Sequence, residues 1–145
     1  MQKIFFLIGW VLCLSPLAFA ENIAVIISEE SPLLANKQTF ELKEIEDIYT
    51  GKTKYLQGSF IKAVNQKDKE ILRQFLKKTC RMDIAAYQER WIKLELETGA
   101  NAPRIIETPG EIIDYVKKEK AGIGFVWENQ AKGIQGIRVA LLLAE

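Results

Sequence analysis

The feature that most restricts the fold of this chain is the run Asn22–Ser28, with the sequence NIAVIIS. Apolar and largely β-branched residues follow one another here without polar alternation, which is typical of a strand buried on both faces. Such a strand needs helices above and below its sheet. A second apolar run, Ile123–Val126, follows a predicted helix and the small residues Ala121 and Gly122. The chain is therefore predicted to form a layered α/β domain.

Amphipathic helices are predicted between the strands, each with a recognisable beginning or end. The first begins near Thr39 and ends at Thr50-Gly51, where glycine suits the residue after a helix. The next two begin after Asp68 and Asp83, residues that favour the N-cap position. The fourth begins after Thr108, where a hydroxyl cap is followed by proline at the first helical position.

Three further strands complete the predicted order of elements. They are Phe60–Val64, Arg104–Glu107 and a last strand from Ile137 to about Leu143. The segments Lys52–Ser59 and Glu128–Gly136 are polar and predicted to be loops. Strands that alternate with helices in this way predict a single three-layer unit. Its sheet is expected to be mostly parallel or mixed, with helices on both faces.

The first twenty residues are predicted to be a signal peptide. Lys3 precedes the apolar run Ile4–Leu14, and Ala18-Phe19-Ala20 has the small-residue pattern of a cleavage site. The run is too short to span a membrane comfortably, since a span needs about 20 apolar residues. Cleavage before Glu21 would leave one domain, residues 21–145. We therefore expect an exported periplasmic protein that is not embedded in the membrane.

The composition excludes several classes of function. The chain has 20 Lys and Arg residues against 19 Asp and Glu residues, a balance that argues against nucleic-acid binding. It contains no histidine, which removes the commonest general base and the commonest metal ligand. No paired nucleophile, metal cluster or phosphate loop is present, so neither an enzyme nor a cofactor is expected. Cys80, the only cysteine after cleavage, is predicted to be a small core residue.

Several motifs occur in an order that resembles a known family, the phosphate-type substrate-binding proteins of ABC transporters. The resemblance covers roughly residues 23–126 and implies the type II periplasmic-binding-protein fold. Full-length members have two lobes that close on the ligand. At about half that length, this chain is expected to form one lobe. The matching pieces are Ile23–Ser28, Ile48-Tyr49-Thr50-Gly51-Lys52, Ala63-Val64-Asn65-Gln66, the helices with Phe75 and Trp91, Val116, and Ala121–Val126.

The sequence departs from that family in the turn before the long helix. Phosphate-binding members carry an arginine, an acidic residue and Ser-Gly-Thr here, and the hydroxyls and helix amides hold the oxyanion. In this chain Gln66 stands near the place of the arginine, and Asp68 keeps the acidic position. Glu70 and Leu72 fall where hydroxyl groups are expected, and Glu70 would repel an anion. These departures argue against phosphate binding in the usual manner of the family.

The candidate ligand residues lie where predicted strands give way to helices or loops, the usual place for ligands in α/β sheets. Each has a plain structural alternative: a capped and solvated helix start for the turn, an ordinary loop for the serines, and a helix cap for the threonine. The candidates are Asn65, Gln66, Lys67 and Asp68 in the turn, Ser28 and Ser31 after the first strand, and Thr108.

Two functions remain open on the sequence alone. The first is an exported, non-enzymatic solute-binding-like protein that binds a small oxyanion such as phosphate, or another small solute, weakly. The resemblance implies an ABC transporter permease as its partner. The second is an interaction or structural module of the cell envelope that has lost phosphate binding. It would contact another envelope protein through Trp127 and Tyr55, or through Ile137–Leu143 as an edge strand.

Overall fold

The computed structural model describes residues 21–144, and the predicted signal peptide lies outside the described residues. This part of the chain forms five helices and seven strands in the order β1-α1-β2-β3-β4-α2-α3-β5-α4-β6-α5-β7. The helices are α1 (Leu42–Tyr49), α2 (Lys69–Thr79), α3 (Ile84–Thr98), α4 (Pro109–Lys118) and α5 (Glu128–Ala131). The strands are β1 (Ile23–Ser28), β2 (Tyr55–Leu56), β3 (Ser59–Phe60), β4 (Lys62–Gln66), β5 (Arg104–Ile106), β6 (Gly122–Trp127) and β7 (Ile137–Leu143).

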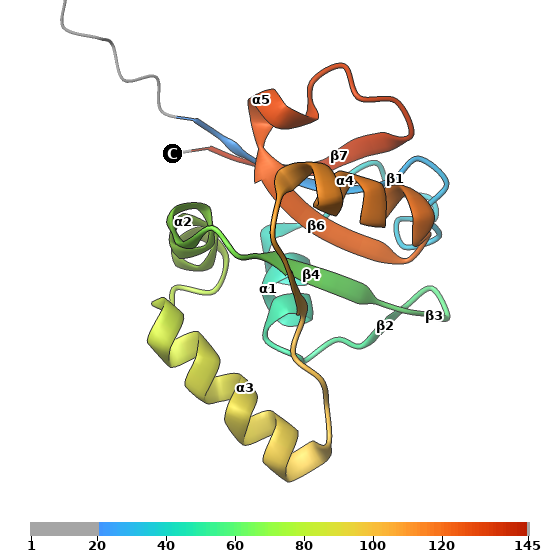
Figure 1. The fold of residues 1–145 in the computed structure, drawn as a ribbon. Coiled ribbons are helices and arrows are strands. Elements are labelled where there is room, and N and C mark those ends of the chain that lie inside the picture. Colours follow the sequence, from blue (N-terminus) through green and yellow to red (C-terminus); the bar gives the residue numbers. More distant parts are fainter. Residues whose placement is uncertain (1–20, 145) are drawn as a thin grey trace, which may run out of the picture.

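Five strands form one mixed sheet in the order β5-β4-β6-β1-β7 (Figure 1). Strand β4 is parallel to both β5 and β6, whereas β1 is antiparallel to both β6 and β7. The carboxyl ends of β4, β5 and β6 therefore share an edge of the sheet with the beginning of β1. This geometry confirms the predicted mixed α/β fold, and it places Ser28, the last residue of β1, at the opposite edge.

Helices cover both faces of the sheet, as predicted. Helices α1, α2 and α3 enclose the larger core, and α4 and α5 enclose the smaller one on the other face. Strand β1 contributes to both cores, since Val25 packs into the larger while Ala24 and Ile26 pack into the smaller. All six residues of β1 are buried, so the prediction of a strand covered on both faces is confirmed.

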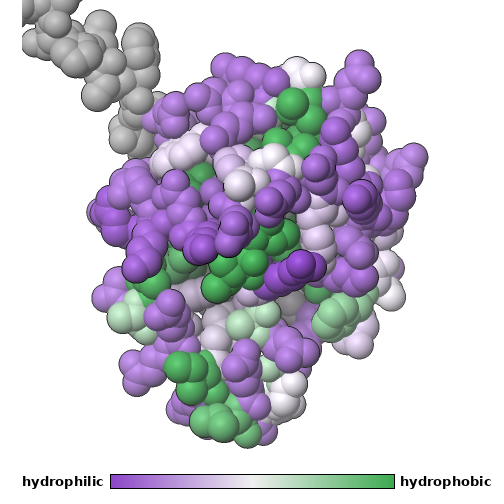
Figure 2. Space-filling model, in the orientation of Figure 1, coloured by the Kyte–Doolittle hydropathy of each residue, from purple (hydrophilic) through white to green (hydrophobic). Residues whose placement is uncertain are grey.

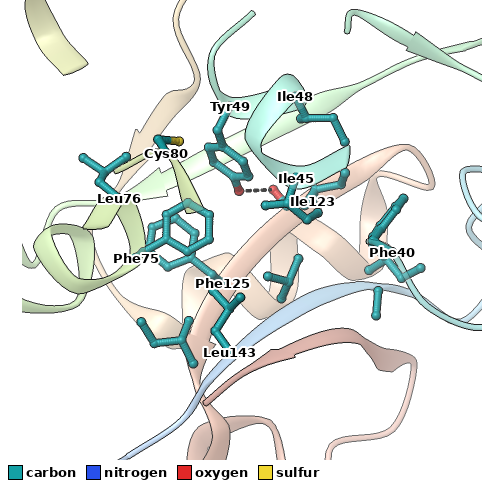
Figure 3. Close-up of a cluster of buried hydrophobic side chains, with 14 of the residues drawn as sticks. Phe40, Ile45, Ile48, Tyr49, Phe75, Leu76, Cys80, Ile123, Phe125 and Leu143 are labelled. Atoms are coloured by element: carbon teal, nitrogen blue, oxygen red, sulfur yellow. Dashed lines mark hydrogen bonds between the residues drawn. The ribbon is translucent and has the colours of Figure 1, made fainter. Parts of the chain in front are cut away.

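Aromatic side chains occupy the centre of the larger core (Figure 3). The rings of Phe75 and Phe125 stack with a centroid distance of 3.8 Å, and Tyr49 lies edge-on to Phe75 at 4.7 Å. Buried aromatic pairs in these arrangements gain energy beyond their buried area. Cys80 is buried beside them as a free thiol, and burial raises its pKa. Its predicted role as a small core residue is confirmed.

Two of the predicted loops contain regular structure. The segment Lys52–Ser59 forms most of a small hairpin of β2 and β3, whose turn residues Gln57 and Gly58 have φ angles of 50° and 76°. Positive φ at both central positions matches the right-handed twist of hairpin strands. The segment Glu128–Gly136 contains the short helix α5. The strand predicted at Phe60–Val64 is shifted by two residues, to Lys62–Gln66.

Hydrophilic side chains cover most of the molecular face shown in Figure 2. Hydrophobic residues on this face gather over the projecting helix α3 and in the middle of the main body. None of the helices within residues 21–144 has the length and apolar character needed to cross a membrane.

Candidate functional site

The candidate site lies at the sheet edge where β4 and β5 end. The backbone N–H of Lys67 donates to the carbonyl oxygen of Ile106 at 3.0 Å, which holds the two strand ends together. Asp68 then leads into α2, and Thr108 leads into α4. The structure therefore brings Lys67, Asp68 and Thr108, three of the candidate ligand residues, to one edge.

Asn65 and Gln66 do not belong to the exposed turn in which they were predicted. Both lie in β4, and their exposed fractions are 4% and 2%. Gln66 Nε2 donates to the carbonyl oxygen of Phe125 at 2.8 Å, and Asn65 Nδ2 donates to the hydroxyl of Tyr87 at 3.2 Å. Buried amides usually find such partners, although Asn65 Oδ1 has none within the described residues. These amides secure the end of β4, and they leave Lys67 and Asp68 as the surface residues of the turn.

The N-terminus of α2 is the main group at this edge that favours an anion, because helix amides and the helix dipole point outward there. Its own carboxylates compete with an external anion. Asp68 caps the helix by accepting from the backbone N–H of Glu70 at 2.9 Å. Glu70 accepts from Arg73 Nη2 at 2.7 and 2.9 Å, and this hydrogen bonding lowers its pKa. Glu70 is therefore ionised at neutral pH and stands in the first turn of α2.

Lys67 forms an ion pair with Glu107, which was not among the candidate residues predicted from the sequence. Its Nζ lies 3.0 Å from Glu107 Oε1, and both side chains are exposed. Glu107 directly follows β5, the neighbour of β4, so strand adjacency was the signal that could have identified it. Lys69 makes no ion pair with another residue of the described chain.

The charges around the start of α2 balance one another. Three carboxylates face three cations here, so an approaching anion meets no net positive field. The carboxylates are those of Asp68, Glu70 and Glu107, and the cations are Lys67, Lys69 and Arg73.

Ser28 and Ser31 lie at the opposite edge of the sheet and do not join this site. The reason is the direction of β1, which runs antiparallel to its neighbours. Ser28 Oγ accepts from the backbone N–H of Glu30, and Ser31 Oγ accepts from that of Leu33, both at 3.2 Å. Each hydroxyl therefore stabilises its own turn, and the two predicted halves of the site are separated.

Thr108 has the geometry of a helix cap. Its Oγ1 accepts from the backbone N–H of Glu111 at 3.2 Å, which satisfies one amide at the start of α4.

Within residues 21–144 no group of His, Cys, Asp and Glu side chains is arranged to hold a metal ion.

No protein-family model and no curated protein matches this chain. Solved structures do share its fold. One is a protein from Clostridium perfringens assigned to the phosphate ABC transporter substrate-binding proteins and solved with bound phosphate. It superposes with a TM-score of 0.63 at 18% identity, covering 83% of this chain and 44% of that protein.

Two other solved structures are similar at lower identity. PstS from Borrelia burgdorferi gives a TM-score of 0.52 at 14% identity and covers 86% of this chain and 47% of its own. The ABC-type phosphate transport receptor from Vibrio cholerae gives 0.52 at 8% identity, covering 82% and 45%. The chain thus has the fold seen in phosphate-binding proteins, and it spans less than half the length of each.

Proposed function

We propose that this protein is an exported, non-enzymatic solute-binding-like protein that binds a small oxyanion weakly at the start of α2. The shared fold supports this proposal, since one of the similar structures was solved with bound phosphate. The absence of histidine from the sequence supports a binding role over a catalytic one. The signal-like segment at residues 1–20 supports a periplasmic location.

The observation that carries the proposal is the position of Lys67 and Lys69 on either side of the α2 N-terminus, at the carboxyl end of β4. An anion here would accept from helix amides and would contact two lysine ammonium groups. Asp68 and Glu70 oppose it, so binding is expected to be weak, with a Kd of about a millimolar. Delivery of the ion to an ABC transporter permease is a further part of the proposal, by analogy with the proteins that share the fold.

Isothermal titration of the purified protein with phosphate and with sulfate tests this function. We expect saturable binding that weakens when Lys69 is replaced in Lys69→Ala, and also in Lys67→Ala. Lys77→Ala is the matched control, because Lys77 is an exposed lysine at the other end of the same helix. Equal losses in Lys69→Ala and Lys77→Ala, or no heat with either anion, would reject the site.

A second candidate function, an interaction module of the cell envelope, is favoured by the surface of β7. This strand forms an edge of the sheet, and its side chains Val139 and Leu142 are 40% and 44% exposed. Exposed apolar edge strands are frequent sites of strand pairing with another protein. Trp127, which the sequence suggested for such a contact, is half-buried and packs against the larger core.

Cross-linking in intact cells distinguishes this candidate from the first. For the interaction module we expect an envelope partner that is lost in Leu142→Lys and retained in Leu96→Lys, a matched change at an exposed leucine on α3. Isothermal titration with phosphate and sulfate would then show no heat of binding. Anion binding together with unchanged cross-linking in Leu142→Lys would exclude the module.

A further inference from the structure

A cleft of about 450 Å³ lies at the beginning of β4, away from the start of α2. The β2–β3 hairpin forms one wall, and the loop from Gly99 to Pro103 forms another. Tyr115 of α4 also lines the cleft. The volume falls within the usual range for small-molecule sites, about 300–1,000 Å³. We call this space the hairpin cleft; the hairpin and the loop lie beside the main sheet in Figure 1.

The floor of the hairpin cleft is the indole ring of Trp91, which is held firmly in place. Its Nε1 donates to the backbone carbonyl oxygen of Tyr49 at 3.0 Å. Gly51 packs so closely that a Cβ atom there would lie 2.8 Å from Cη2 of Trp91, and its φ of 80° also favours glycine. Trp91 is therefore fixed before any ligand arrives, and with an exposed fraction of 6% it offers only a small part of its ring to the cleft.

The hairpin wall carries two exposed aromatic rings. Tyr55 and Phe60 lie opposite each other across the two strands, with ring centroids 5.4 Å apart. Their exposed fractions are 63% and 54%, which are large for aromatic side chains. A hydrogen bond from the N–H of Ile61 to the carbonyl oxygen of Lys54 at 2.9 Å closes the base of the hairpin, just before β4 begins. Rigid aromatic groups of this kind contribute large contact area at low entropic cost.

Two charged side chains line the cleft, and both are cationic. They are Lys54 and Lys62, and no Asp or Glu is among the lining residues of the described chain. Lys62 is neutralised by Glu119, whose Oε2 lies 2.8 Å from its Nζ. Lys54 has no ion-pair partner within residues 21–144. One uncompensated ammonium group therefore stands beside the aromatic walls.

We propose that the hairpin cleft binds a small aromatic carboxylate. The planar ring of the ligand packs against the exposed rings of Tyr55 and Phe60 and touches the small accessible part of Trp91, and its carboxylate pairs with Lys54. Stacked and edge-to-face rings are favourable in such a site, and a carboxylate is the complement of a lone ammonium group. This site lies apart from the one proposed at the start of α2. It also differs in ligand, because inorganic phosphate has no ring to pack against the aromatic side chains of the cleft.

The test uses 4-hydroxybenzoate as probe and follows the indole N–H of Trp91 by two-dimensional NMR of the purified protein. We expect saturable shifts of this resonance below about 10 mM probe. The matched neutral compound 4-hydroxybenzamide should bind at least about fivefold more weakly, because it lacks the charge. Phosphate should leave the Trp91 resonance in place. Equal affinity for acid and amide, an equal response to phosphate, or no shift would overturn the proposal.

A pair of lysine variants tests the predicted contact directly. Lys54→Gln should weaken 4-hydroxybenzoate binding about fivefold and should leave 4-hydroxybenzamide binding unchanged. Lys52→Gln is the control, because Lys52 is an exposed lysine on the same segment that does not line the cleft. Both side chains are exposed, so neither change should disturb the fold. The same loss in both variants, or no loss in Lys54→Gln, would show that Lys54 does not hold the carboxylate.

Discussion

The hydroxyl group of Tyr49 donates a hydrogen bond to the backbone carbonyl oxygen of Val64 at 2.9 Å, and both residues are fully buried. It also lies 3.4 Å from the carbonyl oxygen of Ile123 (Figure 3). This contact joins the last residue of α1 to the middle of β4, the strand that leads to Lys67. A buried hydrogen bond of this kind is stronger than one in water, so it stabilises the position of β4 relative to α1.

Tyr49→Phe should lower the free energy of unfolding by about 1–3 kcal/mol, because the variant leaves a buried carbonyl oxygen without its hydroxyl partner. Urea unfolding followed by circular dichroism measures the change. Tyr55→Phe removes the same hydroxyl from an exposed residue and should change stability by less than about 0.5 kcal/mol. Similar effects in the two variants would mean that the buried hydrogen bond does not stabilise the fold.

Stability should fall in alkaline solution because of Tyr87. Burial raises the pKa of Tyr87 to about 12, whereas an unfolded tyrosine titrates near pH 10. Below about pH 10 the hydroxyl is neutral in both states, so its full contribution is present. As the pH rises from about 10 to 12, only the unfolded state ionises, and about 2–3 kcal/mol is lost. Unfolding midpoints in urea measured across this range should fall less steeply in Tyr87→Phe; an identical slope would contradict the assignment.

Gly124→Ala should destabilise the protein by about 1–3 kcal/mol, since overpacking a tight core strains its neighbours. A Cβ atom at Gly124 would lie 2.6 Å from Cγ2 of Ile112 and 3.3 Å from Cγ2 of Val64. Gly110→Ala is the control, because a Cβ there meets no atom within 4 Å and alanine is the better helix former. Thermal unfolding should show a lower midpoint in the first variant and an equal or higher one in the second.

The sequence predicted the layered fold correctly but could not give the direction of β1. A continuous apolar run shows that a strand is covered on both faces, and that pattern is the same for parallel and antiparallel neighbours. Direction depends on where β6 and β7 lie, which is a property of the whole chain. Ser28 and Ser31 were for this reason predicted beside Lys67, whereas the antiparallel pairing puts them at the far edge.

The end of β4 was missed for a different reason. Asn65 and Gln66 are polar, so the pattern indicated a turn, but each amide has a buried partner that only the folded chain provides. The hairpin turn at Gln57 and Gly58 lacks the Asn-Gly or Asp-Gly pair that marks such turns most clearly. By contrast, Asp68 and Thr108 each cap a helix by accepting from a backbone N–H only two or three residues further along the chain. Such local contacts can be recognised in the sequence, and both caps were predicted correctly.

Glu70→Gln should raise the affinity for phosphate at least about fivefold, because it removes a fixed negative charge from the first turn of α2 and frees Arg73 from its partner. Isothermal titration at low ionic strength measures the gain, and added salt should reduce it since the site is exposed. Glu89→Gln, at an exposed glutamate on α3, changes the net charge equally and should leave the affinity unchanged. If the affinity for phosphate rises equally in Glu70→Gln and Glu89→Gln, the effect comes from net charge, and the anion does not bind at the start of α2.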